Sequence, residues 1–230
     1  MDKNIKVIIP AFNEQNSIVK VIQDIPKEWV SEIVVVNNNS KDDTEKAAAE
    51  AGAKVLSEKR QGYGYACLKG IDYVSQQKPQ PDIVIFMDAD YSDYPEELPK
   101  LVQPILEDSM ELVIGSRAIG ERERGAMTPQ QLFGNWLATR LLKLFYGANF
   151  TDLGPFRAVS WEALQKINMQ DKTYGWTVEM QLKAAKLGLR STEVAVNYRK
   201  RREGVSKVSG TLKGTILAGY KIIWTIFKYR

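Results

Sequence analysis

The chain has 230 residues, of which 44% are hydrophobic, and these values predict one folded globular unit. It contains no histidine and a single cysteine, Cys67, which excludes zinc sites with the usual ligands, disulfides and histidine-assisted nucleophiles. The net charge of +4 is too small to indicate nucleic acid, so we expect no nucleic-acid partner and a chemistry based on carboxylates, cations and the backbone.

The first half of the chain alternates two kinds of pattern. Apolar, β-branched runs typical of strands occupy residues 5–10, 32–37, 53–58, 82–88 and 111–116. Helical patterns over 17–24, 42–52, 64–77 and 95–108 lie between them. This alternation predicts an α/β fold with a mostly parallel central sheet and helices on both faces.

Three polar loops follow predicted strands: PAFNE at 10–14, NNNSKDD at 37–43 and DADYSD at 88–93. In open sheets of this kind, ligands bind at the carboxyl ends of the strands. We therefore expect the three loops to converge on one site. The segment GYGYACLKG at 62–70 lacks the GK[ST] of a phosphate-binding P-loop, and we expect it to open a helix beside that site.

After Ser116 the pattern changes. A charged loop spans 117–129, and helices are predicted over about 130–146 and 176–187. A strand at 192–198, a basic loop at 199–207 and a final helix at 210–230 complete the chain. With no repeat or linker in sight, we expect a single domain at 1–210 followed by a C-terminal amphipathic helix at 211–230.

Asp88 and Asp90 flank Ala89 directly after the apolar run that ends at Met87. Alternate residues at a strand end point the same way, so these two carboxylates can share a divalent cation through oxygen ligands. A solvated turn has the same spacing, but burial of the preceding strand and the expected neighbouring polar loops favour a metal site.

The ordered set VIIPAFNE, VVVNNNSKDDT, GYGYACLKG, DADYSDYPEEL, VIGSR, TDLGPFRA, GWTVEM and RREGVSK resembles family 2 glycosyltransferases with the GT-A fold. It is most similar to dolichyl-phosphate and polyprenyl-phosphate mannosyl- and glucosyltransferases, from about Lys6 to Lys207. The resemblance implies that residues 1–117 bind a nucleotide sugar and that residues 118–210 face the acceptor.

The resemblance also implies roles for individual residues. It implies catalytic roles for Asp90, Arg117, Arg201 and Lys207, with metal binding by Asp88 and Asp90. Substrate binding is implied for Pro10, Phe12 and Glu14 in the first nucleotide-binding segment, Val36 and Asn38 at the base and ribose, Asp88, Ala89 and Asp90 at the diphosphate, Arg117 near the transferred sugar, and Arg201 and Lys207 in a mobile loop.

The sequence departs from the family pattern at two places. Asn37 and Asn38 stand where acidic residues are usual, and Asn39 stands where a glycine is usual. An amide donates as well as accepts hydrogen bonds, which changes what it can recognise. Met127 and Gln131 replace the usual basic residue and hydroxyl that meet the acceptor phosphate, with Arg122 or Arg124 as substitutes.

The implied reaction is inverting, metal-dependent transfer of one sugar from a UDP- or GDP-linked donor to a dolichyl or undecaprenyl phosphate. Mg²⁺ or Mn²⁺ together with Arg201 and Lys207 would neutralise the leaving diphosphate. A lipid phosphate is already an anionic nucleophile and requires no general base. A hydroxyl acceptor would require one, for which Asp93, Asp152 and Glu179 are the candidates.

Three other functions remain open from the sequence. The first is transfer to a glycan or small-molecule hydroxyl. The second is a haloacid dehalogenase-type phosphatase, although its nucleophilic aspartate would follow the first strand and not the fourth. The third is a non-catalytic nucleotide- or anion-binding module at a membrane, in which Asn37 and Asn38 record lost activity.

The last helix places apolar residues and lysines together, with Leu212, Ile216, Tyr220, Ile223, Trp224 and Phe227 at helical spacing. Such a composition is typical of an interfacial helix, and also of a helix packed on the core or on a dimer partner. The N-terminus lacks a signal-peptide pattern. We expect a cytoplasmic protein, peripheral at the cytoplasmic face of a membrane, with a homo-oligomer or a membrane-protein partner as open possibilities.

Overall fold

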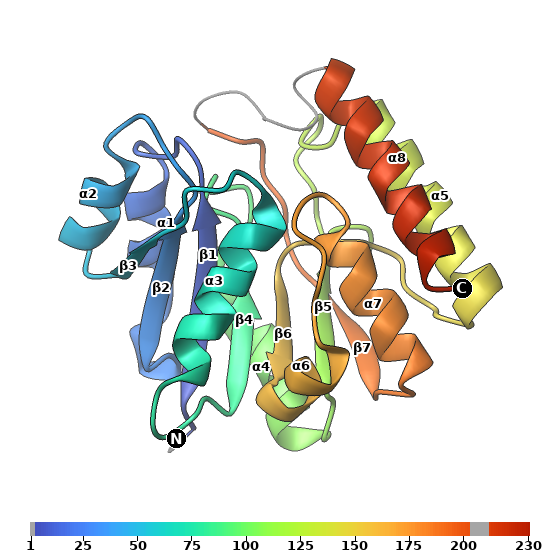
Figure 1. Cartoon of the computed structure of the whole chain (residues 1–230), viewed down its shortest axis with the longest axis horizontal. Helices are drawn as coiled ribbons and strands as arrows, with labels where there is room; N and C mark the ends of the chain where they lie inside the picture. Colours follow the sequence, from blue (N-terminus) through green and yellow to red (C-terminus); the bar gives the residue numbers. More distant parts are fainter. Residues whose placement is uncertain (1–2, 203–211) are drawn as a thin grey trace.

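The computed structural model describes residues 3–202 and 212–230. The described residues form a single α/β domain with a seven-stranded sheet in the order β3-β2-β1-β4-β6-β5-β7 (Figure 1). The strands are β1 (Ile5–Ala11), β2 (Glu32–Asn37), β3 (Lys54–Ser57), β4 (Ile83–Phe86), β5 (Leu112–Ser116), β6 (Arg157–Ser160) and β7 (Ser191–Ala195).

The helices connect and cover these strands. They are α1 (Ile18–Asp24), α2 (Thr44–Glu50), α3 (Tyr63–Ser75), α4 (Leu98–Glu107), α5 (Pro129–Tyr146), α6 (Trp161–Ile167), α7 (Trp176–Lys186) and α8 (Leu212–Lys228), with 3₁₀ turns η1 (Lys27–Trp29) and η2 (Pro95–Glu97). All elements predicted from the sequence are present close to their expected ranges. The short elements β6 and α6 were not predicted.

The sheet is mostly parallel, as predicted. Strands β1 to β4 pair in parallel, and so do β5 and β7, whereas β6 is antiparallel to both β4 and β5. Because β6 runs the opposite way, its amino end lies at the edge where its neighbours have their carboxyl ends. The segment that precedes β6 therefore reaches the same edge as the polar loops.

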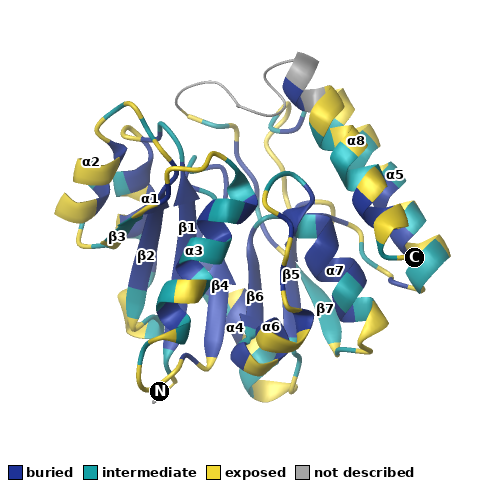
Figure 2. Cartoon of the chain, in the orientation of Figure 1, coloured by how far each residue is buried: buried dark blue, intermediate teal, exposed yellow. Residues whose placement is uncertain are grey.

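Alternation along the central strands builds a core on each face of the sheet. In β1, Val7 and Ile9 pack in the cluster that contains residues of α1 and α4, whereas Ile8 packs in the cluster with α3, α6 and α7. All seven residues of β1 are buried, because both of its faces are covered by helices (Figure 2). This rigid centre fixes the positions of the loops at its carboxyl edge.

Helices α5 and α8 lie side by side beyond the end of the sheet (Figure 1). The Tyr146 hydroxyl donates a hydrogen bond to the carbonyl of Ile226, and the rings of Phe145 and Phe227 are 5.3 Å apart. A capping box of Thr128 and Gln131 starts α5. Together with α7, these helices form a third apolar cluster.

The predicted C-terminal helix has two different sides. Thr225 and Ile226 are buried against the domain, whereas five large apolar side chains of α8 are exposed: Ile216, Leu217, Tyr220, Trp224 and Phe227. Packing on the core, which was one of the two interpretations, thus accounts for part of the helix only. Within the described ranges, no helix combines the length and apolar character needed to cross a membrane.

Candidate active site

The three polar loops converge at the carboxyl edge of the sheet, as predicted. They surround a cavity of about 540 Å³, which we call the donor cavity. Seven of the predicted substrate-binding residues line it together with Arg201 from the segment after β7. Its lining consists of Pro10, Ala11, Phe12, Glu14, Asn38, Gln61, Gly62, Tyr63, Asp88, Ala89, Asp90, Thr173, Tyr174 and Arg201.

Asp88 and Asp90 follow β4 in the wall of the donor cavity. The Oδ1 atom of Asp88 is buried and has no hydrogen-bond partner among the described residues. Burial, reinforced by the charge of Asp90, raises the pKa of Asp88 to about 7. A carboxylate oxygen left without a partner in this position fits a divalent cation.

The described residues contain no group of three or more metal-ligating side chains. Two carboxylates alone are nevertheless sufficient for Mg²⁺, which commonly binds through one or two carboxylates and completes its shell with substrate phosphates and water. Asp88 and Asp90 therefore fit a metal that is bound together with a diphosphate.

Arg201 connects two of the polar loops. Its guanidinium pairs with Glu14 after β1 and, at 3.1 Å, with Asp90 after β4. Burial raises the pKa of Glu14, while the charge of Arg201 and a hydrogen bond from Ser17 oppose the rise. The predicted phosphate-binding arginine thus lies beside the predicted metal site.

The segment that carries Arg201 is held in place by Arg199. The Arg199 guanidinium lies over the rings of Tyr91 and Tyr94, 3.5 Å and 4.1 Å from their centroids. Its Nε atom also donates to the carbonyl of Tyr91 at 2.8 Å. Cation–π contacts with two rings fix this segment against the loop after β4.

A second cavity, of about 590 Å³, meets the donor cavity at Asp88, Asp90 and Arg201. We call it the acceptor-side cavity. It extends between the sheet and helices α5 and α8. Besides residues shared with the donor cavity, its lining includes Ser92, Arg117, Thr128, Gln131, Leu153, Pro155, Trp176, Tyr198, Lys200, Ala218 and Ile222.

Arg117 lies in the acceptor-side cavity and is locked by Asp152. Its Nε and Nη2 atoms donate to the two oxygens of Asp152, each at 2.8 Å. Burial alone would raise the pKa of Asp152, but the charge and hydrogen bonds of Arg117 hold this pKa below its ordinary value. The arginine is thereby fixed in orientation within the cavity wall.

Two predicted site residues are not found in either cavity. Val36 is completely buried, and its side chain belongs to the core cluster that contains Phe86. The Val36 side chain therefore does not line the cavity, and the predicted substrate-binding role of Val36 stays a prediction that only its backbone could fulfil. Lys207 lies outside the described residues.

The expected acceptor-phosphate substitutes are also placed differently. Neither Arg122 nor Arg124 lines the acceptor-side cavity, whereas Lys200 does. Gln131 lines the cavity, but its side-chain oxygen accepts from the Thr128 backbone in the capping box at 2.8 Å. Lys200 belongs to the predicted basic loop at 199–207.

The three candidate general bases are structural or inaccessible. Asp152 is held by Arg117, and Glu179 is fully buried and accepts from the backbone of Gln170 and Asp171. Both oxygens of Asp93 are buried without a partner in the described part of the chain. Burial, with the charge of Asp88, raises the pKa of Asp93 well above its ordinary value. None of the three lines either cavity.

The amide of Asn38 holds the wall of the donor cavity. Its Nδ2 donates to the carbonyls of Glu58 and Arg60 at 3.2 and 2.7 Å, and its Oδ1 accepts from Gly62 at 2.8 Å. Asn37 similarly bonds Glu45 and the backbone of Ser40. A carboxylate could donate neither to the two carbonyls that Asn38 contacts nor to the Glu45 carboxylate, so the amides at positions 37 and 38 have a structural explanation.

We expect Asn38→Asp to lower the free energy of unfolding by about 1–3 kcal/mol, because the buried carbonyl of Glu58 and the part-buried carbonyl of Arg60 lose their donor and face a negative charge. Urea denaturation measures this change. Asn39→Asp is the matched control, because it makes the same chemical change at an adjacent exposed side chain. Equal stability of both variants would contradict the structural role of the Asn38 amide.

Tyr63, Thr173 and Tyr174 line both cavities but were not predicted as site residues. Tyr63 starts α3 within the glycine-rich segment, which the sequence did place beside the site. Thr173 and Tyr174 precede α7. In the sequence, they do not belong to any loop that follows a predicted strand. The sequence contains no pattern that would have revealed them.

Comparison with known proteins agrees with this geometry. Residues 6–167 match Glycosyl transferase family 2, and the chain belongs to that family. An uncharacterized glycosyltransferase of Mycobacterium tuberculosis is 35% identical over 93% of this chain and 94% of the relative. An undecaprenyl-phosphate mannosyltransferase of Micrococcus luteus is 30% identical over 90% of this chain and 88% of its own.

The fold is also that of solved glycosyltransferase structures. Glucosyl-3-phosphoglycerate synthase from Mycobacterium tuberculosis, in complex with Mn²⁺, UDP and glucosyl-3-phosphoglycerate, superposes with a TM-score of 0.78. It is 26% identical, and the match covers 99% of this chain and 80% of the synthase. The chain is thus a glycosyltransferase of the GT-A fold, which confirms the predicted family, fold and enzyme class and rules out the phosphatase interpretation.

Proposed function

We propose that this enzyme transfers one sugar, with inversion, from a UDP- or GDP-linked donor to a polyprenyl phosphate at a membrane surface. The nucleotide sugar would occupy the donor cavity, and the acceptor would enter through the acceptor-side cavity. Residues 1–117 then supply most of the donor side, and residues 118–210 with α8 supply the acceptor side. The two cavities meet at Asp88 and Asp90, where the transferred sugar would lie.

The observation that carries this proposal is the absence of a base. Among the described residues, Asp88 and Asp90 are the sole carboxylates that line the acceptor-side cavity. An acceptor hydroxyl would require a base at its attacking oxygen. A phosphate oxygen is ionised at neutral pH, so it can attack the sugar without losing a proton to the protein.

The lining of the acceptor-side cavity supports a lipid-linked phosphate. Arg117 and Lys200 provide positive charge near Asp88 and Asp90. Farther along, Leu153, Ala218 and Ile222 provide an apolar wall that reaches helix α8. Charge at one end and apolar surface at the other match a phosphate attached to a hydrocarbon chain. The printed name of the Micrococcus luteus relative points to the same acceptor class.

On the donor side, Asp88 and Asp90 would hold Mg²⁺ or Mn²⁺, which when bound neutralises charge on the diphosphate. Arg201 lies next to these carboxylates and would contact the leaving phosphate, and Lys207 of the same segment keeps its predicted role as its partner. Pro10, Phe12 and Glu14 would border the nucleotide. Structures of glucosyl-3-phosphoglycerate synthase with Mn²⁺ or Mg²⁺ and UDP support this arrangement.

Peripheral attachment through α8 completes the proposal. Tyr220, Trp224 and Phe227 are exposed on this helix, and Lys228 lies 5.2 Å from the centroid of the Trp224 ring. Exposed aromatic residues with interspersed lysines are typical of helices that lie in the membrane interface. Attachment there would bring the end of the acceptor-side cavity close to the lipid that supplies the acceptor.

The direct test is incubation with UDP- and GDP-sugars, Mn²⁺ or Mg²⁺ and a short polyprenyl phosphate in detergent. We expect a sugar-containing product that extracts into chloroform. A thermal-shift screen of nucleotide sugars with and without metal identifies the donor, since binding raises apparent stability by mass action. Nucleotide release without any lipid product, for every donor, would contradict the proposed acceptor.

Narrowing the acceptor-side cavity should affect the acceptor and not the donor. We expect Ala218→Phe to raise KM for polyprenyl phosphate on the order of tenfold, since an aromatic ring overfills this wall. The KM for the nucleotide sugar should stay unchanged. Leu217→Phe is the control, because Leu217 points to solvent with 44% exposure. An unchanged KM for polyprenyl phosphate in Ala218→Phe would contradict the proposal that the acceptor binds in this cavity.

A second candidate is transfer to a small phosphorylated acceptor, as the name of the solved synthase suggests for that protein. Arg117 and Lys200 would then bind the acceptor phosphate while a hydroxyl attacks. The same assay with 3-phosphoglycerate in place of the lipid separates the two functions. A water-soluble sugar product with no chloroform-soluble one would establish the second.

A further inference from the structure

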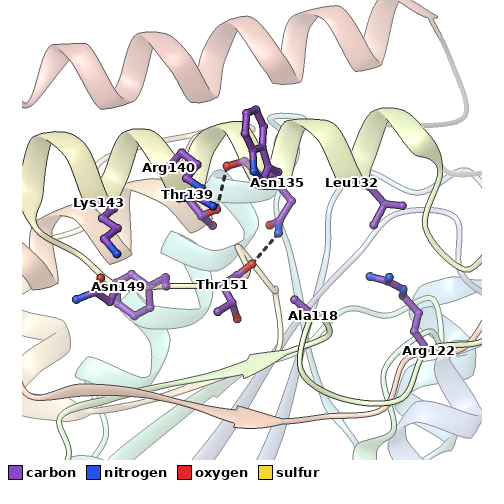
Figure 3. A pocket seen from close by; sticks show the side chains of 11 residues that line it. Ala118, Arg122, Leu132, Asn135, Thr139, Arg140, Lys143, Asn149 and Thr151 are labelled. Atoms are coloured by element: carbon purple, nitrogen blue, oxygen red, sulfur yellow. Dashed lines mark hydrogen bonds between the residues drawn. The ribbon is translucent and has the colours of Figure 1, made fainter.

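A separate groove of about 500 Å³ runs along helix α5 (Figure 3). It shares no lining residue with the donor or acceptor-side cavity. One wall is α5, and the other is formed by the loop after β5 and by residues 149–151. Nothing in the proposed transfer reaction uses this groove.

The groove is positively charged. Arg122, Arg140 and Lys143 line it, and no aspartate or glutamate does so among the described residues. Arg140 and Lys143 are exposed and form no ion pair within the described ranges. The carboxylate of Glu193 bonds the groove residue Thr151, but its oxygens are engaged by that residue and by the backbone of Asp152.

Two long segments of the sequence around this groove contain basic residues but no acidic ones. Residues 124–151, which include all of α5, contain no aspartate or glutamate. Residues 204–230, which include all of α8, contain none either. Two adjacent helices therefore present basic side chains without acidic neighbours from their own elements, which favours an anionic partner.

The positive groove has an apolar border. Leu132 and Trp136 line it with 40% and 52% of their surface exposed, and the neighbouring Phe133 is 62% exposed. Leu132, Trp136 and Arg140 recur at spacings of four and so lie on one face of α5. The rings of Phe133 and Trp136 are 5.9 Å apart. A free phosphate would neutralise the charge but would leave this apolar surface in water.

We propose that the groove on α5 binds the headgroup of an anionic glycerophospholipid. Arg140 and Lys143 would contact the lipid phosphate, while Leu132, Phe133 and Trp136 enter the interface beside it. A lipid fits the groove better than a free anion does. Its phosphodiester matches the positive charge, and its two acyl chains match the apolar border. The inference rests on the proposed membrane location of the enzyme and adds a lipid class and a second attachment element next to α8.

The test is vesicle cosedimentation of the whole chain with phosphatidylcholine alone and with phosphatidylcholine containing phosphatidylglycerol. We expect the wild type to favour the anionic vesicles. The double variant Arg140→Gln/Lys143→Gln should bind them roughly 30-fold more weakly, since each basic residue near such a surface contributes about a factor of five.

The matched control is Lys20→Gln/Lys46→Gln, which removes the same charge from exposed positions on α1 and α2, at the opposite end of the sheet from α5 (Figure 1). We expect it to change anionic vesicle binding less than about threefold. An equal loss in both double variants would show general charge attraction and would overturn the groove assignment. Wild-type binding that does not depend on phosphatidylglycerol would overturn it as well.

Two further arms separate the possible sources of failure. Inorganic phosphate alone is tested by thermal shift, and stabilisation that is lost in Arg140→Gln/Lys143→Gln, without preference for anionic vesicles, would assign the groove to a free phosphate instead. Sugar transfer to polyprenyl phosphate is measured in detergent on the same proteins. A missing transfer activity would contradict the proposed function. Because vesicle binding needs no turnover, the vesicle experiment would still test the groove.

Discussion

Asp90→Asn should lower kcat for sugar transfer by roughly 10²- to 10³-fold, because it removes a charged ligand that stabilises the leaving diphosphate. The substitution keeps the side-chain volume. The hydrogen bond that Ser92 donates to Asp90 at 3.0 Å can be made by an amide oxygen. The free energy of unfolding should therefore stay within about 1 kcal/mol of the wild type.

Two measurements make this expectation decisive. Calorimetric titration of the nucleoside diphosphate should show tighter binding with Mn²⁺ in the wild type and no effect of Mn²⁺ in Asp90→Asn. Glu96→Gln serves as the control, because it makes the same chemical change on an exposed side chain in η2. Full activity in Asp90→Asn would exclude a metal role for this residue.

Asp152→Asn should destabilise the fold by about 3 kcal/mol, because it removes the carboxylate that is directly hydrogen-bonded to the buried guanidinium of Arg117. The Asp152 side chain is fully buried and that of Arg117 is 10% exposed. For a chain of this size the melting temperature should fall by ~10 °C. Chemical denaturation and thermal unfolding measure both values. Glu50→Gln is the control, since it breaks an exposed pair with Lys46 that is worth roughly 0.3–0.5 kcal/mol.

The same pair gives an expectation for pH. Arg117 holds the pKa of Asp152 below its ordinary value of 3.8, so the pair stabilises the folded state at pH values above 3.8. As the pH falls through 3.8 toward the lower pKa of the folded state, this contribution is lost. The stability difference between wild type and Asp152→Asn should be constant near neutral pH and should shrink in acid. A difference that grows in acid would contradict the assigned partner.

The sequence was sufficient to predict the sheet and the convergence of the three polar loops. Alternation of apolar runs and helical patterns defines a parallel sheet, and the carboxyl ends of its strands necessarily meet at one edge. Pro10, Asn38 and Asp88 could therefore be placed together although they are far apart in the chain. The predicted strand at 192–198 delivers the basic loop to the same edge, and the family resemblance then indicated Arg201 within that loop.

Strand β6 was missed for a physical reason. It has four residues and begins with Arg157, a charge that interrupts any apolar run. The guanidinium is fully buried and donates to the carbonyls of Leu153, Gly154 and Thr177, which only the tertiary structure brings together. A buried cation solvated by backbone carbonyls cannot be recognised from periodicity.

The roles of Asp152 and Glu179 also depend on contacts that only the tertiary structure creates. Both residues looked available for base chemistry because a sequence shows a carboxylate without showing what it contacts. In the fold, Asp152 faces Arg117, and Glu179 forms an ion pair with Lys183 and caps a neighbouring backbone segment. Val36 shows the same dependence on the fold, because its side chain belongs to the core and only its backbone could contact the nucleotide.

The bridge from Arg201 to Glu14 and Asp90 has an implication for how the catalytic centre is charged. The Arg201 guanidinium already offsets part of the negative charge of these acids, so a divalent ion held by Asp88 and Asp90 would compete with it for Asp90. The apparent affinity for the metal ion would therefore depend on the free energy needed to move the Arg201 side chain away from Asp90. Metal binding and the position of the segment that carries Arg201 would then be coupled through the shared carboxylate of Asp90.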